Sequence, residues 1–249
     1  MNSIISLNGK RILITGGARG LGRAFAEAAI FAGAEVFIAD ILEDVGMKTA
    51  EEVGSAFVKL DLRDPKSVTN CMMTVSKDLG GLDGLVNCGA IATGIGGPNM
   101  NEIDFDIWNK IMEVNVRGTW LMSKAAVPHL AQNKNSKIVN IASDTAMWGA
   151  PKLMAYVASK GAIISMSRSM SRELGDDNIA VNCIAPGLTS VEATEYVPVE
   201  RKIQYIEGRS IKREQLPEDV TGAVLFLLSD AANFVTGQCL AVNGGFVMN

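Results

Sequence analysis

Tyr156 and Lys160, four residues apart, are the side chains in this sequence best suited to proton transfer. Helical periodicity runs through their segment, and residues four apart on a helix lie one turn apart on the same face. A free phenol titrates at a pKa of about 10, but a cation within about 4–6 Å favours the phenolate. We therefore expect Lys160 to lower the pKa of Tyr156 toward the working pH and to make Tyr156 a general acid/base.

Ser143 and Asn115 are polar residues that could complete such a site. Ser143 follows a predicted strand, so its hydroxyl should lie at the carboxyl edge of a sheet and hold the substrate oxygen. Asn115 lies within a long predicted helix and could hold a water that links Lys160 to solvent. Each residue also has a structural alternative: the Tyr–Lys spacing occurs by chance, Ser143 could cap a turn, and Asn115 could be a hydrogen-bonded core amide.

A glycine-rich turn, TGGARGLG, lies between a predicted strand and a predicted helix. In this position Gly16 permits a tight turn, Gly20 lets the backbone approach a phosphate, and Gly22 lets helix and strand pack closely. The helix N-terminus adds N–H donors and a positive dipole. We expect pyrophosphate of a dinucleotide to be held by Gly16, Arg19, Gly20, Leu21 and Gly22.

Asp40 ends the second predicted strand, at the distance from the turn where an acid contacts the adenosine ribose. Its carboxylate can accept hydrogen bonds from the ribose hydroxyls and would repel a 2′-phosphate, so NAD is favoured over NADP as the cofactor. Arg19 is the opposing feature, because a cation in the turn could meet a 2′-phosphate. Its structural alternative is a solvated side chain. Ile41, rather than a base, follows Asp40 and agrees with NAD.

Asp61 and Leu62 end the third predicted strand and should lie beside the adenine. Asp61 could accept a hydrogen bond from the exocyclic amine while Leu62 packs on the ring. Alternatively, Asp61 is a helix N-terminal acid ahead of Pro65. The two roles are compatible.

Short apolar runs alternate with helical segments along the whole chain, which predicts an α/β fold with a parallel sheet covered on both faces. We expect one domain over residues 1–249, because no repeat or flexible linker interrupts the alternation. The irregular stretch 188–216 is either a lid over the substrate or a solvated charged face. We predict strands over 11–15, 35–39, 56–60, 82–87, 137–142, 179–184 and about 238–242, and helices over 20–32, 43–53, 65–79, 105–132, 155–174 and 217–228.

These features together resemble the single-domain short-chain dehydrogenases/reductases along essentially the whole chain. The matching motifs are Thr15-Gly16, Gly20-Leu21-Gly22, Asp40, Asp61-Leu62, Asn87-Cys88-Gly89-Ala90, Asn115, Ser143, Tyr156, Lys160 and Pro186-Gly187.

The resemblance implies a three-layer Rossmann fold with about seven strands, an Asn115–Ser143–Tyr156–Lys160 tetrad and a homotetramer built on the helices that carry Asn115 and Tyr156. It also implies that Lys160 and Tyr156 contact the nicotinamide ribose region, that Asn87 and Gly89 form a turn beside adenosine, and that Pro186, Gly187 and Thr189 contact the nicotinamide end. Cys88 and Asn243 depart from the asparagine and aspartate usual in the family.

Composition excludes several other classes of function. A net charge of -4 and a pI of about 5.2 argue against nucleic-acid or anionic-membrane partners. The four cysteines form no CxxC pair and His129 is the single histidine, so neither a metal site nor a disulfide framework is indicated. No apolar run approaches the roughly 20 residues that span a bilayer, and basic residues follow the apolar stretch 1–7 rather than precede it. We expect a cytoplasmic protein.

The expected activity is hydride transfer between NAD and a secondary alcohol or ketone. The alternatives are an NADPH-dependent reductase of ketones on acyl-carrier protein and a scaffold that binds nucleotide without catalysis. An NADPH-dependent reductase would need a basic residue in place of Asp40 or directly after it. A non-catalytic scaffold commonly lacks the tyrosine or the lysine, and both are present here. An uncharged carbinol should be bound by some of Ile91, Thr93, Asp144, Trp148, Met154, Leu188, Val191 and Tyr196, with Asp144 either orienting a second hydroxyl or serving as a turn residue.

Overall fold

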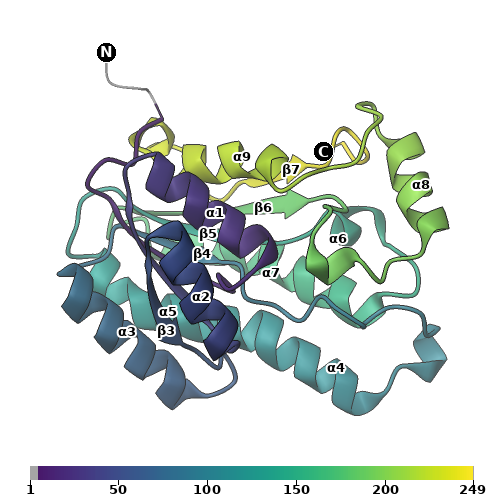
Figure 1. Cartoon of the computed structure of the whole chain (residues 1–249), viewed down its shortest axis with the longest axis horizontal. Coiled ribbons are helices and arrows are strands. Elements are labelled where there is room, and N and C mark those ends of the chain that lie inside the picture. Colours follow the sequence, from purple (N-terminus) through teal and green to yellow (C-terminus); the bar gives the residue numbers. More distant parts are fainter. Residues whose placement is uncertain (1–4, 249) are drawn as a thin grey trace.

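The computed structural model describes residues 5–248, so the first four residues of the apolar N-terminal stretch and Asn249 lie outside the described part. Within it, seven parallel strands form one sheet in the order β3-β2-β1-β4-β5-β6-β7 (Figure 1). The strands are β1 (Arg11–Thr15), β2 (Glu35–Asp40), β3 (Ala56–Lys59), β4 (Gly84–Asn87), β5 (Ser136–Ile141), β6 (Ile179–Pro186) and β7 (Cys239–Val242). The predicted parallel α/β sheet is confirmed.

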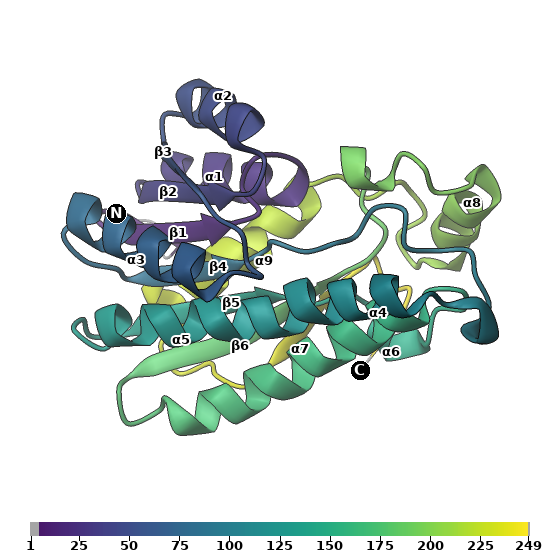
Figure 2. The same cartoon turned by 90° about the horizontal axis from the view of Figure 1, so that it is seen from below.

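Helices cover both faces of this sheet. Among the residues described, they are α1 (Gly20–Phe31), α2 (Glu43–Val53), α3 (Pro65–Leu79), α4 (Phe105–Met112), α5 (Thr119–Leu130), α6 (Thr145–Trp148), α7 (Met154–Glu173), α8 (Val199–Gly208) and α9 (Glu218–Leu228). Figure 2 shows α3, α5 and α7 on one side of the strands and α1 and α9 on the other. None of the described helices is long and apolar enough to cross a membrane.

Alternating residues of the strands supply the two cores. On β1, Ile12 and Ile14 pack with Phe25 of α1 and Val224 of α9, whereas Leu13 points to the opposite core with residues of α3 and α5. All three β1 side chains are fully buried. A strand whose successive side chains face opposite cores must be apolar throughout, which explains the continuous apolar runs in the sequence.

Local signals define the ends of several helices. Asp64 caps α3 by accepting a hydrogen bond from the Lys66 amide, Pro65 occupies the first helical turn, and Gly80 ends the helix with φ +67°. A proline at the start and a left-handed glycine at the end are the favoured arrangement. Because these signals are local, the observed bounds of α2 and α3 are those predicted.

Two stretches differ from the prediction. The expected single helix over 105–132 is α4 and α5 joined by a π-helical turn at Glu113–Gly118. The stretch 188–216 is less irregular than expected, because it contains a 3₁₀ turn at Glu192–Thr194 and α8. The short helix α6 was not predicted. These features depend on contacts with distant segments, which periodicity along the chain does not report.

The strand order reverses at β1, whose two neighbours are β2 and β4. The connections from neighbouring strands leave on opposite faces there and open a crevice beyond the carboxyl ends of the strands. Open α/β sheets bind their ligands at this point. Residues that end β1, β2, β4, β5 and β6 are therefore gathered at one edge.

Candidate active site

A cleft of about 510 Å³ lies at this carboxyl edge. The segments after β1, β2, β3, β4, β5 and β6 all contribute to its wall, together with the stretch that follows β6. The predicted site residues that line it are Gly16, Arg19, Gly20, Leu21, Gly22, Asp40, Asp61, Leu62, Gly89, Ser143, Tyr156, Pro186, Gly187 and Thr189. The cleft is long enough to bring the glycine-rich turn and Tyr156 into one continuous site.

Two glycines of the glycine-rich turn are packed too tightly to be replaced by a residue with a side chain. A Cβ on Gly16 would lie 2.6 Å from the Gly89 Cα, and one on Gly22 would lie 2.0 Å from the Gly16 carbonyl oxygen. Gly16 and Gly20 also adopt positive φ values of 69° and 56°. The turn thus keeps its backbone bare at the N-terminus of α1, where N–H groups can hold phosphate oxygens. These residues fit a pyrophosphate.

Asp40 lies beside this turn and helps to shape it. Its Oδ2 accepts a hydrogen bond from the Ala18 amide at 3.1 Å, and its Oδ1 accepts one from the Leu42 amide at 3.0 Å. A carboxylate oxygen can accept more than one hydrogen bond, so both oxygens keep acceptor capacity for ribose hydroxyls. Arg19, on the turn, is exposed.

Asp61 lines the cleft but is paired with Arg63. The Arg63 guanidinium donates to both carboxylate oxygens, at 3.0 and 2.7 Å, and this hydrogen bonding lowers the pKa of Asp61. Asp64, rather than Asp61, caps α3, so the helix-terminal interpretation of Asp61 was wrong. Arg63 also lines the cleft and was not found by sequence reasoning, since no local pattern singles it out.

Ser143 is held by Thr145, its neighbour two residues along the chain. The Thr145 hydroxyl donates to the Ser143 Oγ at 2.9 Å and the Thr145 amide donates at 3.3 Å. With both lone pairs of its oxygen occupied, the Ser143 hydroxyl can direct its own hydrogen toward Tyr156 or a substrate oxygen. The spacing Ser-x-Thr at a strand end is a sequence signal that could have identified Thr145.

Lys160 lies below the Tyr156 ring, with its Nζ 5.6 Å from the ring centroid. This nitrogen donates to the Ile141 carbonyl at 2.7 Å, which leaves two of its three N–H groups for other acceptors. The side chain of Lys160 is buried, and burial lowers the pKa of the ammonium to about 8. The tyrosine and lysine share one helix face, as the spacing predicted.

Burial raises the pKa of Tyr156 above its ordinary value, while the Ser143 hydroxyl lowers it by a smaller amount. This direction is opposite to the lowering expected from Lys160. Desolvation disfavours a phenolate and is the largest cause of this rise in pKa. The pKa of Tyr156 therefore depends on how far water is excluded from the phenol as well as on the charge of Lys160.

The π-helical turn places Asn115 between two elements of the site. Its side-chain amide accepts from the Ile91 amide at 2.8 Å and donates to the Ile91 carbonyl and to the Ser159 hydroxyl. Its side chain is thus committed to the loop after β4 and to α7. A π turn of this kind often marks a functional position in a helix. A water relay through Asn115 stays a prediction.

Asn87 does not line the cleft. Its side-chain amide donates to Ser123 and to Asn140, within the sheet and α5, so it supports the strands that carry the site. The turn that follows keeps its backbone role despite Cys88, because the Thr15 hydroxyl accepts hydrogen bonds from the Cys88 and Gly89 amides. These bonds do not involve the Cys88 side chain.

Asn243 directly follows β7 and stabilises the C-terminal turn. Its Oδ1 accepts from the Gly245 amide at 3.0 Å, and its Nδ2 donates to the Val247 carbonyl at 3.3 Å. A carboxylate could accept the first bond but could not donate the second. This donor is a physical reason for asparagine at a position where the family usually has aspartate.

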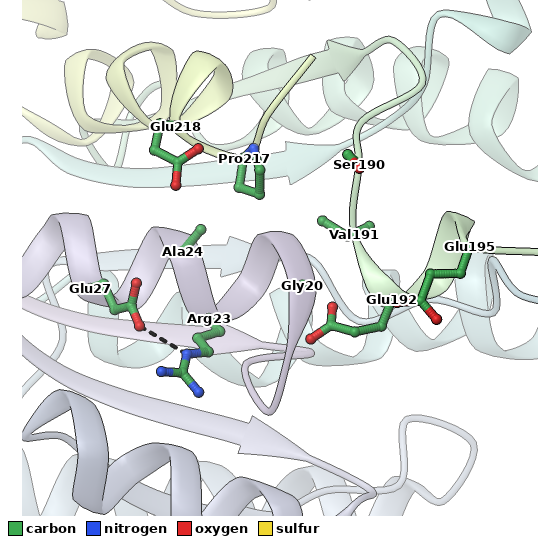
Figure 3. Close-up of a pocket in the computed structure, with 10 residues that line it drawn as sticks. All are labelled: Gly20, Arg23, Ala24, Glu27, Ser190, Val191, Glu192, Glu195, Pro217 and Glu218. Carbon is green, nitrogen blue, oxygen red and sulfur yellow. Dashed lines mark hydrogen bonds and ion pairs between the residues drawn. The ribbon is translucent and has the colours of Figure 1, made fainter. Parts of the chain in front are cut away.

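The stretch after β6 crosses the glycine-rich turn. Figure 3 shows Val191 and Glu192 facing Gly20, beside a shallow pocket that also contains Glu195. A Cβ on Gly20 would lie 3.6 Å from both the Glu192 carboxylate and the Val191 Cβ. Further along, the Tyr196 hydroxyl donates to the Ala92 carbonyl at 3.0 Å, across the mouth of the site. The stretch therefore contacts both the glycine-rich turn and the loop after β4, and its role as a lid stays a prediction.

We predict that Glu192→Gln will strengthen binding of NAD about two- to fivefold at low ionic strength, because a carboxylate beside the turn repels pyrophosphate. The effect should shrink as salt is added. Isothermal titration calorimetry of the purified wild type and variant with NAD measures the dissociation constants. Glu195→Gln is the matched control, because Glu195 lines the shallow pocket but not the cleft. Equal dissociation constants for wild type and Glu192→Gln would contradict this placement of Glu192.

The candidate substrate residues divide into two groups. Ile91, Thr93 and Val191 line the cleft. The remainder do not, and Asp144 is fully buried, so its proposed contact with a substrate hydroxyl was wrong. Sequence reasoning missed several lining residues that no local pattern marks: Lys110, Val114, Ala193 and Thr194.

Comparisons with known proteins agree with this geometry. A sequence profile described as enoyl-(acyl carrier protein) reductase matches residues 16–247. The chain is 35% identical to 2-(S)-hydroxypropyl-CoM dehydrogenase 3 of Xanthobacter autotrophicus, over 96% of this chain and 97% of that one. It is 31% identical to the 3-oxoacyl-(acyl-carrier-protein) reductase FabG of Aquifex aeolicus, over 97% and 98% of the two chains.

A solved structure of a short-chain type dehydrogenase/reductase from Mycobacterium ulcerans has a TM-score of 0.92 to this fold at 28% identity, and the match covers 97% of this chain and 90% of that chain. The Rossmann fold, the glycine-rich turn and the sequence matches lead to one assignment. This chain is an oxidoreductase that belongs to the short-chain dehydrogenase/reductase family.

Proposed function

We propose that this protein is a single-domain enzyme that transfers a hydride between NAD and a secondary alcohol or its ketone, with Tyr156 as general acid/base. The observation that carries the proposal is one cleft that contains both the phosphate-binding turn and Tyr156 beside Ser143. The buried Lys160 ammonium below the phenol supports the same assignment.

Each polar residue has a definite task in this proposal. The Ser143 hydroxyl, whose oxygen already accepts from Thr145, donates to the oxygen of the alcohol or ketone. Tyr156 removes the hydroxyl proton in oxidation and returns it in reduction. Lys160 favours the phenolate and uses its remaining N–H groups to hold the nicotinamide ribose. When bound, the dinucleotide supplies the hydride acceptor or donor and, when oxidised, a positive charge that favours phenolate.

NAD is the proposed cofactor because of Asp40. Its carboxylate keeps acceptor capacity beside the turn, where the adenosine ribose of a dinucleotide would lie. A 2′-phosphate there would meet a negative charge at short range. Arg19 lines the same part of the cleft and is the residue that would favour NADP.

The names of the relatives support the substrate class. A 2-hydroxypropyl group is a secondary alcohol and a 3-oxoacyl group is a ketone, so both named activities interconvert these two functional groups. The name of the 3-oxoacyl reductase relative supports the alternative function, which is reduction of a ketone carried on acyl-carrier protein. The neutral lining residues Ile91, Thr93 and Val191 favour an uncharged carbinol.

The deciding experiment is a panel of substrates assayed by the absorbance of reduced nicotinamide. Aliphatic, cyclic and aromatic secondary alcohols are offered with NAD and NADP, and the matching ketones and a 3-oxoacyl thioester with NADH and NADPH. We expect turnover of at least one secondary alcohol with preference for NAD. Turnover confined to the 3-oxoacyl thioester with NADPH would favour the alternative, and no turnover by a chain that binds NAD would favour a scaffold.

We also propose a homotetramer that uses the helices around Asn115 and Tyr156. Phe105 and Ile107 on α4 and Trp120 on α5 are large apolar side chains with exposures of 83%, 47% and 44%. Apolar residues gathered on one pair of helices are a common mark of a buried subunit contact. Sedimentation velocity should give four chains per particle, and a monomer at micromolar concentration would contradict the proposal.

A further inference from the structure

The segment behind Ser143 contains a buried carboxylate with no role in the proposed chemistry. Asp144 is 0% exposed, and neither of its side-chain oxygens has a partner at good hydrogen-bond geometry among the residues described, although Asn243, the Thr145 amide and Tyr205 lie close enough to lower its pKa in part. Its backbone is fixed, because the Asp144 amide donates to the Pro186 carbonyl and its carbonyl accepts from the Met147 amide. Buried carboxylates without hydrogen bonds are costly, so one retained beside an active site calls for an explanation.

The groups around Asp144 form a polar cluster that is sealed from solvent. Arg209 and Tyr205 are buried beside it, and the Arg209 Nε and the Trp148 Nε1 also lack hydrogen-bond partners within the described chain. Aromatic rings close the cluster, with Tyr205 stacked on Phe246 at 4.5 Å between centroids. Charges in such surroundings are weakly screened and act over longer distances than at a surface.

Two observations connect this cluster with the reaction centre. Asp144 directly follows Ser143 at the end of β5, so the carboxylate is attached to the backbone that positions the hydroxyl. Its negative charge is also one of the groups that raise the pKa of Tyr156. Burial raises the pKa of Asp144 to about 7, so this negative charge develops across the neutral pH range.

We propose that Asp144 is a positioning residue whose buried carboxylate, from behind Ser143, sets how readily Tyr156 releases its proton. The inference rests on the proposed function of Tyr156 and deepens it. Other titratable or polar groups also act on the protonation of Asp144 and Tyr156. Those that face Asp144 are Arg209, Tyr205 and Asn243, and those that face Tyr156 are Ser143, Lys160, Tyr196 and Cys88.

The sign of the effect follows from the charges. A negative Asp144 disfavours the phenolate, so its removal should lower the apparent pKa of Tyr156 and move the acid limb of alcohol oxidation to lower pH. One buried charge at this range should produce a shift of about 0.5–1.5 pH units. The gain is present only where Asp144 is charged, so above about pH 7, at one pH unit below the wild-type midpoint, Asp144→Asn should react about three- to eightfold faster than wild type.

The test measures kcat/KM for the alcohol against pH, at saturating NAD, for wild type, Asp144→Asn and Asp144→Ser. Both uncharged variants should show the shift of the acid limb to lower pH. If one of them fails to fold, the other still tests the inference. Asp144→Glu should return the limb toward its wild-type position. Asp177→Asn is the matched control, because Asp177 is exposed and distant from the cleft but carries the same charge.

The inference is overturned if the acid limb of the pH profile stays at the wild-type pH in both uncharged variants. It is also overturned if the variants lose activity by the same factor at every pH. The latter is the result of a purely structural role. Tyr156→Phe is assayed in parallel to separate this failure from that of the proposed function. If Tyr156→Phe is inactive and the Asp144 variants keep the wild-type profile, only the inference about Asp144 fails.

Discussion

Tyr156→Phe should lower turnover of a secondary alcohol by about two to four orders of magnitude while leaving NAD affinity nearly unchanged. The substitution removes one oxygen from a side chain that lines the cleft beside Ser143 and above Lys160. Phenylalanine keeps the ring and its packing, so the loss is confined to proton transfer. Single-turnover hydride transfer and a separate titration with NAD measure the two quantities.

Tyr196→Phe is the matched control for this experiment. Its hydroxyl donates to the Ala92 carbonyl in the loop after β4 and has no part in the proposed proton transfer, so we expect turnover to fall by less than about fivefold. A Tyr156→Phe protein that keeps more than about a tenth of wild-type turnover would show that another group carries the proton.

Asp40→Ser should shift the ratio of kcat/KM values for NAD and NADP by about tenfold to a hundredfold toward NADP. At an effective dielectric near 20, two charges about 4 Å apart interact by roughly 4 kcal/mol, and solvent at the rim should reduce this to about 1–3 kcal/mol. Each 1.4 kcal/mol corresponds to about a tenfold ratio. Serine can still accept one of the two amide hydrogen bonds that Asp40 accepts from Ala18 and Leu42.

Two further variants sharpen the result for Asp40. Arg19→Ala in the Asp40→Ser background should reverse part of the gain, because Arg19 would no longer be available to a 2′-phosphate. Asp44→Ser removes an acid of α2 outside the cleft and controls for net charge. Steady-state kinetics with both cofactors decides the matter. A wild type that already prefers NADP, or a ratio that does not move in Asp40→Ser, would refute the assignment of NAD.

Several features were predictable because they depend on neighbours in the sequence. The fold class follows from the alternation of apolar runs and helical segments, and the ends of α3 follow from Asp64, Pro65 and Gly80. The common helix face of Tyr156 and Lys160 needs only a spacing of four residues. Position at a strand end was enough to bring Ser143 and Asp40 to the cleft.

Other features depend on packing between distant segments. Asn87 belongs to a familiar motif, but its register opposite Asn140 buries it in the sheet instead of the cleft. The π turn at Asn115 is coupled to Ile91 in the loop after β4. Hydrogen-bond partners of this kind are chosen by tertiary geometry, so motif matching by itself does not identify them.

The sequence by itself determined which chemical groups stand at the ends of the strands, because the positions of strands along the chain and the faces of helices follow from local periodicity. Only the tertiary structure decided the electrical environment of those groups. Asp144 and Tyr156 show the difference: burial raises the pKa of both side chains, although in the sequence one is an ordinary turn acid and the other a phenol beside a lysine. Desolvation is set by all the atoms that exclude water, and these come from segments far apart in the chain.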